Sequence, residues 1–195
     1  MSGSDRVNPA SPGQKLTYDD LLLFPEDEGK RHELIDGEHY VTPSPVPRHQ
    51  RILSNLHFHI RLWLENHPVG QVYFANLDVV LSQHDVVVPD LMYATNARLS
   101  EIATEKNWRG APNLVVEIGS PGTRRRDETI KRRLYERSGV EEYWVVDAKT
   151  DVVRVYGHEG NAFALVNELS REAGDVITTP LLPGLELPLS RIFQD

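Results

Sequence analysis

The sequence predicts an α/β (α+β) fold, and three observations support this class. Apolar residues recur at helical spacing across 48–66. Short runs rich in Val, Ile and Leu, bounded by turn residues, indicate strands within 71–92, at 114–118 and at 142–147. A second helix-like stretch, 123–138, separates the last two of these strands. With 195 residues the chain can bury one sizeable core, so we expect helices packed on a sheet in one domain.

The N-terminal part divides into an arm and a short first helix. Residues 1–15 are rich in Ser, Gly and Pro and lack periodicity, so we expect a disordered arm before a domain at 16–195. Thr17 followed by Asp20 is typical of a helix N-cap with an acidic first turn. We expect this helix to end at Pro25, because proline cannot continue it.

A hairpin, a long helix and three strands follow. The Asp36-Gly37 pair within 31–41 favours a type I′ hairpin turn. The periodic stretch 48–66 predicts a helix that ends before Pro68, because the residue preceding a proline disfavours helix. The next three strands should form a meander, and they lie at 71–75, 77–81 and 86–92.

The C-terminal half alternates helices and strands. A short helix is indicated around 99–105, before the buried strand 114–118. The following helix has Thr123 as its expected N-cap and ends at Gly139, a residue suited to the left-handed conformation after a helix. After the strand 142–147, we expect a hairpin with strands at 152–156 and 163–166, and an irregular cover at 181–189.

Composition narrows the class of protein. The chain has no cysteine, which excludes disulfides, thiolate nucleophiles and sulfur-bound zinc and is compatible with a reducing cytoplasm. No apolar stretch approaches the roughly 18 residues of a membrane span and no signal-peptide pattern is present, so we expect a cytoplasmic protein. A formal net charge of −8 argues against sequence-independent adhesion to nucleic acid. Motifs of zinc proteases, nucleotide triphosphatases and serine hydrolases are missing from the sequence.

Two acidic residues interrupt apolar strands: Asp90 after Val-Val-Val-Pro and Glu117 after Asn-Leu-Val-Val. Burying a carboxylate is costly unless it is paired, hydrogen-bonded or bound to a metal. Because Mg²⁺ prefers oxygen ligands, both carboxylates and the carbonyl of Ile118 predict a magnesium site, which Mn²⁺ could also occupy. Lys131 on the following helix could orient a water or neutralise charge on a phosphate. This set predicts metal-assisted phosphodiester hydrolysis.

A basic run lies beside the acidic pair. Arg124 to Arg126, with Lys131, Arg132 and Arg133, concentrates positive charge that could hold a phosphate backbone. A solvated helix face is the alternative interpretation of the same residues.

Several motifs occur together in an order and spacing that resemble one family. They are Glu33-Leu34-Ile35-Asp36-Gly37-Glu38, Arg48-His49-Gln50, Pro89-Asp90, Val116-Glu117-Ile118-Gly119-Ser120-Pro121, Asp127 to Lys131, Tyr135 and Gly139-Val140-Glu141-Glu142-Tyr143-Trp144-Val145-Val146-Asp147. The combination resembles the Uma2 family, or DUF820, over roughly residues 17–192. The resemblance implies a restriction-endonuclease-like PD-(D/E)xK core, with a mixed sheet flanked by helices, and DNA as substrate.

The resemblance also implies roles for individual residues. Asp90 matches the Asp of the PD-(D/E)xK motif, and Glu117 matches its second acid. Gly119 stands where the common pattern has lysine. In this family a lysine on the next helix takes that role, and the matching residue is Lys131.

Alternatives stay open at these positions. Glu33 matches an early acidic residue that many such nucleases place near the metal, and Glu38 is a competing candidate. Asp90 could instead end a strand as a turn residue. Glu117 could form a structural ion pair with Lys131.

Neighbouring polar residues have structural interpretations. Asp127 is expected to support the helix start and pair with Lys131 rather than bind metal, and Tyr135 is expected to belong to the core. His49 opens a helix that could lie beside the site, but a lone histidine is more often a surface or packing residue. His57 and His59 lie two positions apart on a helix and cannot form a metal pair.

Three functions compete. The first is a Mg²⁺- or Mn²⁺-dependent DNA endonuclease, for which a homodimer is expected by analogy, since double-strand cleavage needs two sites. The second is a nuclease-like fold that binds nucleic acid or a protein without cutting, suggested by the missing strand lysine and the acidic net charge. The third is a hydrolase of smaller phosphate esters.

Overall fold

The computed structural model describes residues 15–24, 30–42, 44–119, 127–160 and 162–194. Several sequence-based predictions therefore fall outside the described residues. They concern residues 1–14 of the arm, the helix end at Pro25, the N-cap Thr123 and the arginines at 124–126.

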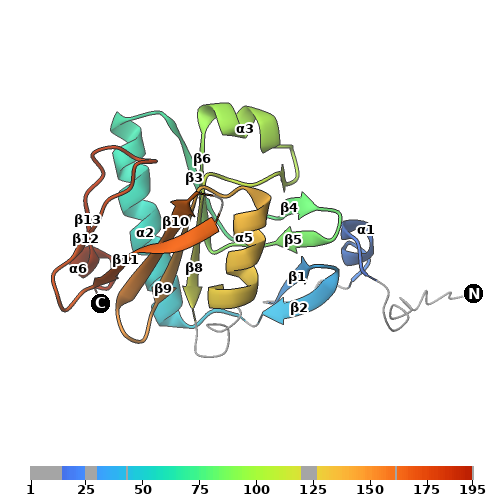
Figure 1. The fold of residues 1–195 in the computed structure, drawn as a ribbon, viewed down its shortest axis with the longest axis horizontal. Helices are drawn as coiled ribbons and strands as arrows, with labels where there is room; N and C mark the ends of the chain where they lie inside the picture. Colours follow the sequence, from blue (N-terminus) through green and yellow to red (C-terminus); the bar gives the residue numbers. More distant parts are fainter. Residues whose placement is uncertain (1–14, 25–29, 43, 120–126, 161, 195) are drawn as a thin grey trace, which may run out of the picture.

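A six-stranded sheet forms the centre of the fold (Figure 1). Its strand order is β11-β10-β9-β8-β6-β3. Strands β8 and β9 are parallel, and the remaining pairs are antiparallel, which confirms the expected mixed sheet. In chain order the strands are β3 (Gly70–Phe74), β6 (Leu91–Thr95), β8 (Leu114–Gly119), β9 (Glu142–Asp147), β10 (Val152–Glu159) and β11 (Ala162–Ser170).

Helices cover both faces of this sheet. On one face lies α2 (Pro47–Asn66), and on the other lie a π-helical turn, η1 (Asp127–Lys131), and α5 (Arg132–Ser138), as Figure 1 shows for α2 and α5. Side chains alternate along β8, so its residues 114, 116 and 118 enter the core cluster of α2 and Val115 enters that of α5. The same alternation turns Glu117 toward α5.

A second sheet packs beside the first, with strand order β2-β1-β5-β4-β7. Its strands are β1 (Arg31–Ile35), β2 (Glu38–Thr42), β4 (Val79–Ser82), β5 (Asp85–Val87) and β7 (Trp108–Arg109). The predicted hairpin turn is confirmed, because Asp36 and Gly37 have φ values of 54° and 76° and the type I′ turn requires positive φ at both positions.

The expected meander is wrong. The predicted strand 86–92 is two strands, β5 and β6, which belong to different sheets. Pro89 explains the break, since it has no N–H for a ladder and the chain leaves one sheet and enters the other between Val88 and Asp90. Strand β3 therefore pairs with β6, while β4 pairs with β5 and β7.

The remaining elements are short. Thr17 and Asp20 form the predicted capping at α1 (Tyr18–Leu21), and Gly139 ends α5 with φ of 85°. Helix α3 (Asn96–Ile102) begins three residues earlier than expected. The predicted irregular cover 181–189 contains one short strand, β13 (Leu187–Pro188), which pairs with β12 (Val176–Ile177), and α6 (Leu189–Ile192) begins at its end. Within the described ranges no helix is long and apolar enough to cross a membrane.

Candidate active site

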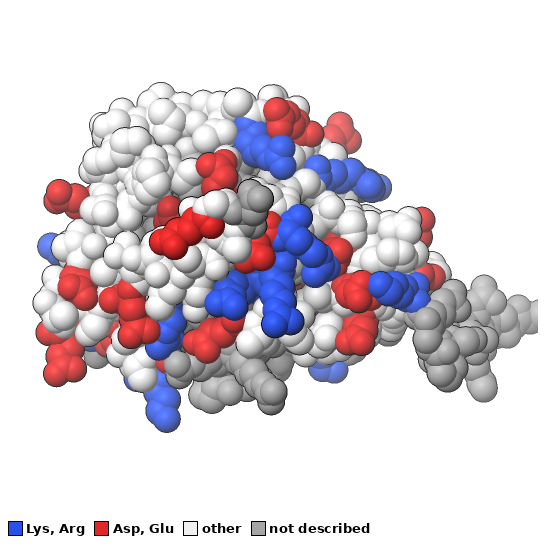
Figure 2. Space-filling model, viewed as in Figure 1, with Lys and Arg blue, Asp and Glu red and all other residues white. Residues whose placement is uncertain are grey.

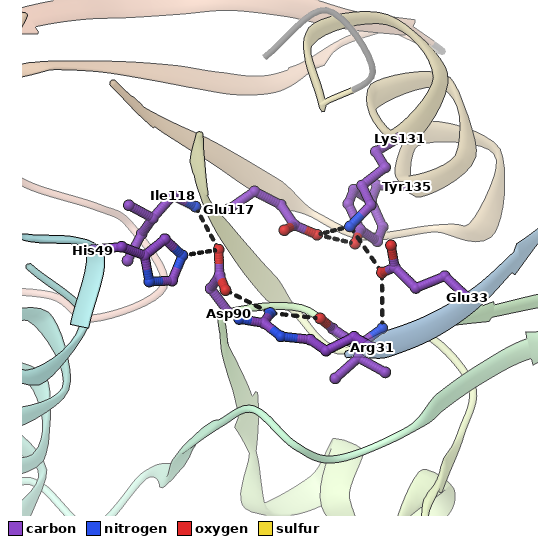
Figure 3. A network of polar contacts seen from close by, with 9 residues as sticks. Arg31, Glu33, His49, Asp90, Glu117, Ile118, Lys131 and Tyr135 are labelled. Atoms are coloured by element: carbon purple, nitrogen blue, oxygen red, sulfur yellow. Dashed lines mark hydrogen bonds and ion pairs between the residues drawn. The ribbon is translucent and has the colours of Figure 1, made fainter. Parts of the chain in front are cut away.

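The four predicted catalytic residues meet in one buried polar network (Figure 3). Glu33 comes from β1, Asp90 from the link between the two sheets, Glu117 from β8 and Lys131 from the end of η1. Each of the four side chains is at most 5% exposed. The site therefore lies where the second sheet, the central sheet and the α5 layer join.

Lys131 connects two of the carboxylates. Its Nζ lies 2.8 Å from Oε1 of Glu33 and 2.8 Å from Oε1 of Glu117. The backbone N–H of Val88 also donates to Oε1 of Glu33, at 3.0 Å. The ion pair between Lys131 and Glu117, one of the alternatives from the sequence, is thus present. Lys131 also pairs with a second acid, Glu33.

Tyr135 extends this half of the network. It lies one turn after Lys131, and its hydroxyl donates to Oε1 of Glu117 at 2.6 Å. Burial and the charge of Glu117 raise the pKa of Tyr135 well above its ordinary value, so the hydroxyl stays a donor. Tyr135 is a core residue, as expected, but its polar end faces the site.

Asp90 forms the other half of the network. Nη1 of Arg31 donates to its Oδ1 at 2.6 Å, while the N–H of Ile118 donates to Oδ2 at 2.7 Å and Nε2 of His49 lies 3.1 Å from Oδ2. Burial alone would raise the pKa of Asp90, but His49, Arg31 and the N–H of Ile118 outweigh it and lower the pKa below its ordinary value. Asp90 is therefore held as a carboxylate.

The two halves are joined through β8. Glu117 and Ile118 are consecutive: the side chain of the first contacts Lys131, and the backbone N–H of the second contacts Asp90. The carbonyl of Ile118 as a metal ligand stays a prediction.

The donor chemistry of the site suits a hard divalent cation. Three carboxylates gather in a buried place, and Mg²⁺ is commonly held by one or two carboxylates together with waters. As placed, the described side chains contain no group of three or more His, Cys, Asp or Glu residues positioned to hold a metal. The carboxylates instead face the cationic nitrogens of Lys131 and Arg31.

The competing early acid lies elsewhere. Glu38 is exposed on β2, and its Oε2 accepts a hydrogen bond from the hydroxyl of Tyr40 at 2.8 Å. Of the two candidates, Glu33 is the one that the structure brings to Asp90, Glu117 and Lys131. The side chain of Asp127 lies outside the described residues.

Sequence reasoning missed Arg31 and undervalued His49. Arg31 precedes Glu33 by two positions on β1, so both side chains lie on one face of the strand, and that spacing could have revealed it. His49 is buried and starts the apolar stripe of α2 that continues at Ile52, Leu53 and Leu56. A polar residue at an apolar position of that stripe was the available signal.

Part of the predicted basic run lies on the surface of α5. Figure 2 shows Lys and Arg side chains gathered over the region where Figure 1 places this helix. Arg133 is exposed, the guanidinium of Arg132 lies 5.2 Å from the ring centroid of Tyr156, and Arg137 pairs with Asp85 at 2.7 Å. Lys131 differs from its neighbours because it is buried in the network.

Comparisons with known proteins concern the family and the fold of this chain. The sequence profile described as "Uma2: Putative restriction endonuclease" matches residues 17–190. A Synechocystis protein, "Uncharacterized protein slr1290", is 23% identical over 191 residues, which is 96% of each chain. The crystal structure of "a putative nuclease belonging to DUF820" from Anabaena variabilis has a TM-score of 0.75 and 21% identity, and the match covers 91% of this chain and 97% of that one. At this identity the structural likeness shows the fold.

Proposed function

The chain belongs to the Uma2 family, whose profile is described as a putative restriction endonuclease, and on that premise we propose that it is a Mg²⁺- or Mn²⁺-dependent DNA endonuclease. The observation that carries the proposal is the convergence of Glu33, Asp90, Glu117 and Lys131. Four separate segments bring three carboxylates and one ammonium into a single buried network. Perturbed or buried ionisable groups that cluster in this way are typical of functional sites.

The proposed roles follow from charge and position. Asp90 and Glu117 would hold the cation, with the carbonyl of Ile118 as a further oxygen ligand. When bound, the cation supplies an activated water and neutralises charge on the phosphate. Lys131 would stabilise the negative charge that grows on the phosphate oxygens. In the reaction a water loses one proton as its oxygen bonds to phosphorus, the P–O bond to the leaving sugar oxygen breaks, and that oxygen takes up one proton.

Asp90→Asn and Glu117→Gln test this proposal, because each keeps the side-chain size and removes one charge. Supercoiled plasmid is incubated with each protein in Mg²⁺ or Mn²⁺, and thermal unfolding confirms that the variants are folded. We expect cleavage by the wild type and by the exposed control Glu172→Gln, and none by the two site variants. Undiminished cleavage by a clean preparation of Asp90→Asn would exclude this site.

A second function is favoured by one specific observation. Both oxygens of Asp90 are already bound by protein groups, as in a site that serves structure rather than catalysis. A nuclease-like module that binds nucleic acid or a protein without cutting would keep this arrangement. It predicts salt-sensitive DNA binding and no product with any divalent cation.

A homodimer is part of the same proposal, because two sites are needed to cut both strands of a duplex. Sedimentation equilibrium of the wild type, alone and with a short duplex, tests it. A monomer under both conditions would restrict the proposed activity to single-strand nicking.

A further inference from the structure

The charges of the network are nearly balanced within the protein. Glu33, Asp90 and Glu117 face two basic side chains, Lys131 and Arg31. This leaves one net negative charge, His49 aside. Because an unpaired buried charge is strongly unfavourable, the two cations are what allows three carboxylates to share this place.

The two cations are not equivalent. The side chain of Lys131 is 3% exposed, whereas that of Arg31 is 13% exposed. Nζ of Lys131 donates hydrogen bonds to two carboxylates. Nη1 of Arg31 donates one to Asp90 at 2.6 Å and lies 3.4 Å from the carbonyl oxygen of Val88. Figure 3 shows the two side chains approaching the carboxylates from different elements. Arg31 is the cation closer to solvent and the one with fewer described ties to carboxylates.

The oxygens of Asp90 also differ. Oδ2 is held by the backbone N–H of Ile118 and by His49, both of which belong to elements of the central sheet and its helix. Oδ1 is bound by the long side chain of Arg31. Asp90 can therefore keep its place through Oδ2 while Arg31 moves away from Oδ1.

We propose that Arg31 has two positions: it neutralises Asp90 in the metal-free site, and it binds a phosphate of the substrate when a divalent cation occupies the carboxylates. This inference rests on the proposed function. A divalent cation would change the net charge of the group from one negative to one positive, which favours an anion nearby. The planar guanidinium fits two phosphate oxygens at once, and such pairs are the strong form of charge-assisted hydrogen bond.

The charges around Arg31 agree with this assignment. Burial alone would lower the pKa of Arg31, but the carboxylates of Asp90, Glu117 and Glu33 outweigh it and raise the pKa. All three acids thus act on this guanidinium. A cation among them would reduce the attraction that holds Arg31 inward.

The proposal predicts effects of opposite sign from one substitution. Arg31→Met removes a charge that competes with the metal, so Mn²⁺ should bind about tenfold more tightly, as expected for the loss of one charged hydrogen bond. The same variant loses a phosphate contact, so its KM for duplex DNA should rise by about the same factor. A purely structural role predicts that metal binding weakens as well.

Calorimetric titration of Mn²⁺ alone into the metal-free chain gives the first readout, and cleavage kinetics on a short duplex give the second. Arg31→Lys is the matched variant, because it keeps the positive charge but loses the planar guanidinium that can bind two phosphate oxygens at once. We therefore expect near-wild-type Mn²⁺ affinity and a raised KM for duplex DNA. Arg191→Met, an exposed arginine of α6, should change neither quantity. Should Arg31→Met fail to fold without metal, Arg31→Lys decides alone.

The outcomes separate this inference from the proposed function. Wild type that binds Mn²⁺ and cuts DNA, with Arg31→Met binding Mn²⁺ equally or more weakly, overturns the role of Arg31 and leaves the nuclease site standing. An unchanged KM in Arg31→Lys overturns it too. Wild type that neither binds Mn²⁺ nor cuts DNA overturns the proposed function, and the inference with it.

Discussion

Lys131 and Glu33 are 98 positions apart in the chain and meet in the interior, with Nζ of the lysine 2.8 Å from Oε1 of the glutamate. The contact ties the second sheet to the helical layer of the central sheet. It also places two charged groups away from water, where each depends on the other.

Lys131→Met should destabilise the metal-free protein strongly. The substitution leaves Glu33 and Glu117 without their shared cation, and breaking a buried ion pair costs about 3–5 kcal/mol of unfolding free energy. Urea unfolding of the variant and of the exposed control Lys106→Met measures this difference. A loss below about 1 kcal/mol, the value typical of surface pairs, would contradict the described burial.

Tyr135→Phe should cost about 1.5–3 kcal/mol, because the buried hydroxyl donates to a charged carboxylate. Tyr73→Phe is the matched control, since its hydroxyl donates to Oε1 of Gln71 on the surface. We expect the control to lie within about 0.5 kcal/mol of the wild type. Chemical unfolding at neutral pH compares the two, and equal losses would mean that the Tyr135 bond is not formed.

Glu142 predicts a pH dependence of stability. Burial raises its pKa, although the indole N–H of Trp144 and the hydroxyl of Thr179 donate to it and oppose the shift. Because the folded pKa is raised, the favourable contribution of Glu142 is complete below the unfolded pKa of about 4.3 and is lost as the pH rises through the folded value.

Glu142→Gln should therefore match the wild type near pH 4 and exceed its stability near pH 8. The amide oxygen can accept from Trp144 and the amide nitrogen can donate to Thr179, so both bonds survive without the buried charge. Thermal unfolding across this range, with exposed Glu172→Gln as control, tests the prediction. A variant less stable than wild type at pH 8 would show that the charged form is needed.

Gly70→Ala should be more harmful than Gly139→Ala, although both add one methyl group. A Cβ at Gly70 would collide with the carbonyl of Ala94 and the ring of Tyr93, and we expect a loss of about 3 kcal/mol from overpacking. A Cβ at Gly139 meets no atom within 4 Å, so the variant bears only the left-handed backbone cost of about 1–2 kcal/mol. Parallel urea titrations give the order, and the reverse order would contradict the close approach of β3 to β6.

Local patterns predicted the part of the site that depends on neighbouring elements. Glu117, Lys131 and Tyr135 come from a strand and the helix that follows it, and such a helix packs back onto its own strand. The alternation of β8 then decides that Glu117 faces Lys131. These residues are therefore close in the sequence and close in space, so sequence spacing alone could predict their contact.

The contribution of β1 could not be predicted in the same way. Only the resemblance indicates Glu33, and no sequence pattern by itself indicates Arg31, because nothing local tells which distant strand adjoins a hairpin. That pairing depends on the crossing at Pro89, which the apolar run 86–92 conceals by resembling one continuous strand. Because of this crossing, β1 lies beside β5, with Leu34 opposite Val86. The side chain of Arg31 then reaches Asp90, and that of Glu33 reaches Lys131.

The long separation of Glu33 and Lys131 also has a consequence for biosynthesis. A ribosome adds about 5–20 residues per second, so roughly 5 to 20 s pass between the synthesis of Glu33 and that of Lys131. During that interval the second sheet lacks the ammonium that compensates its buried acid. The nascent chain is consequently without a finished site until most of the protein has been synthesised, which keeps any activity of this centre from appearing on partly made chains.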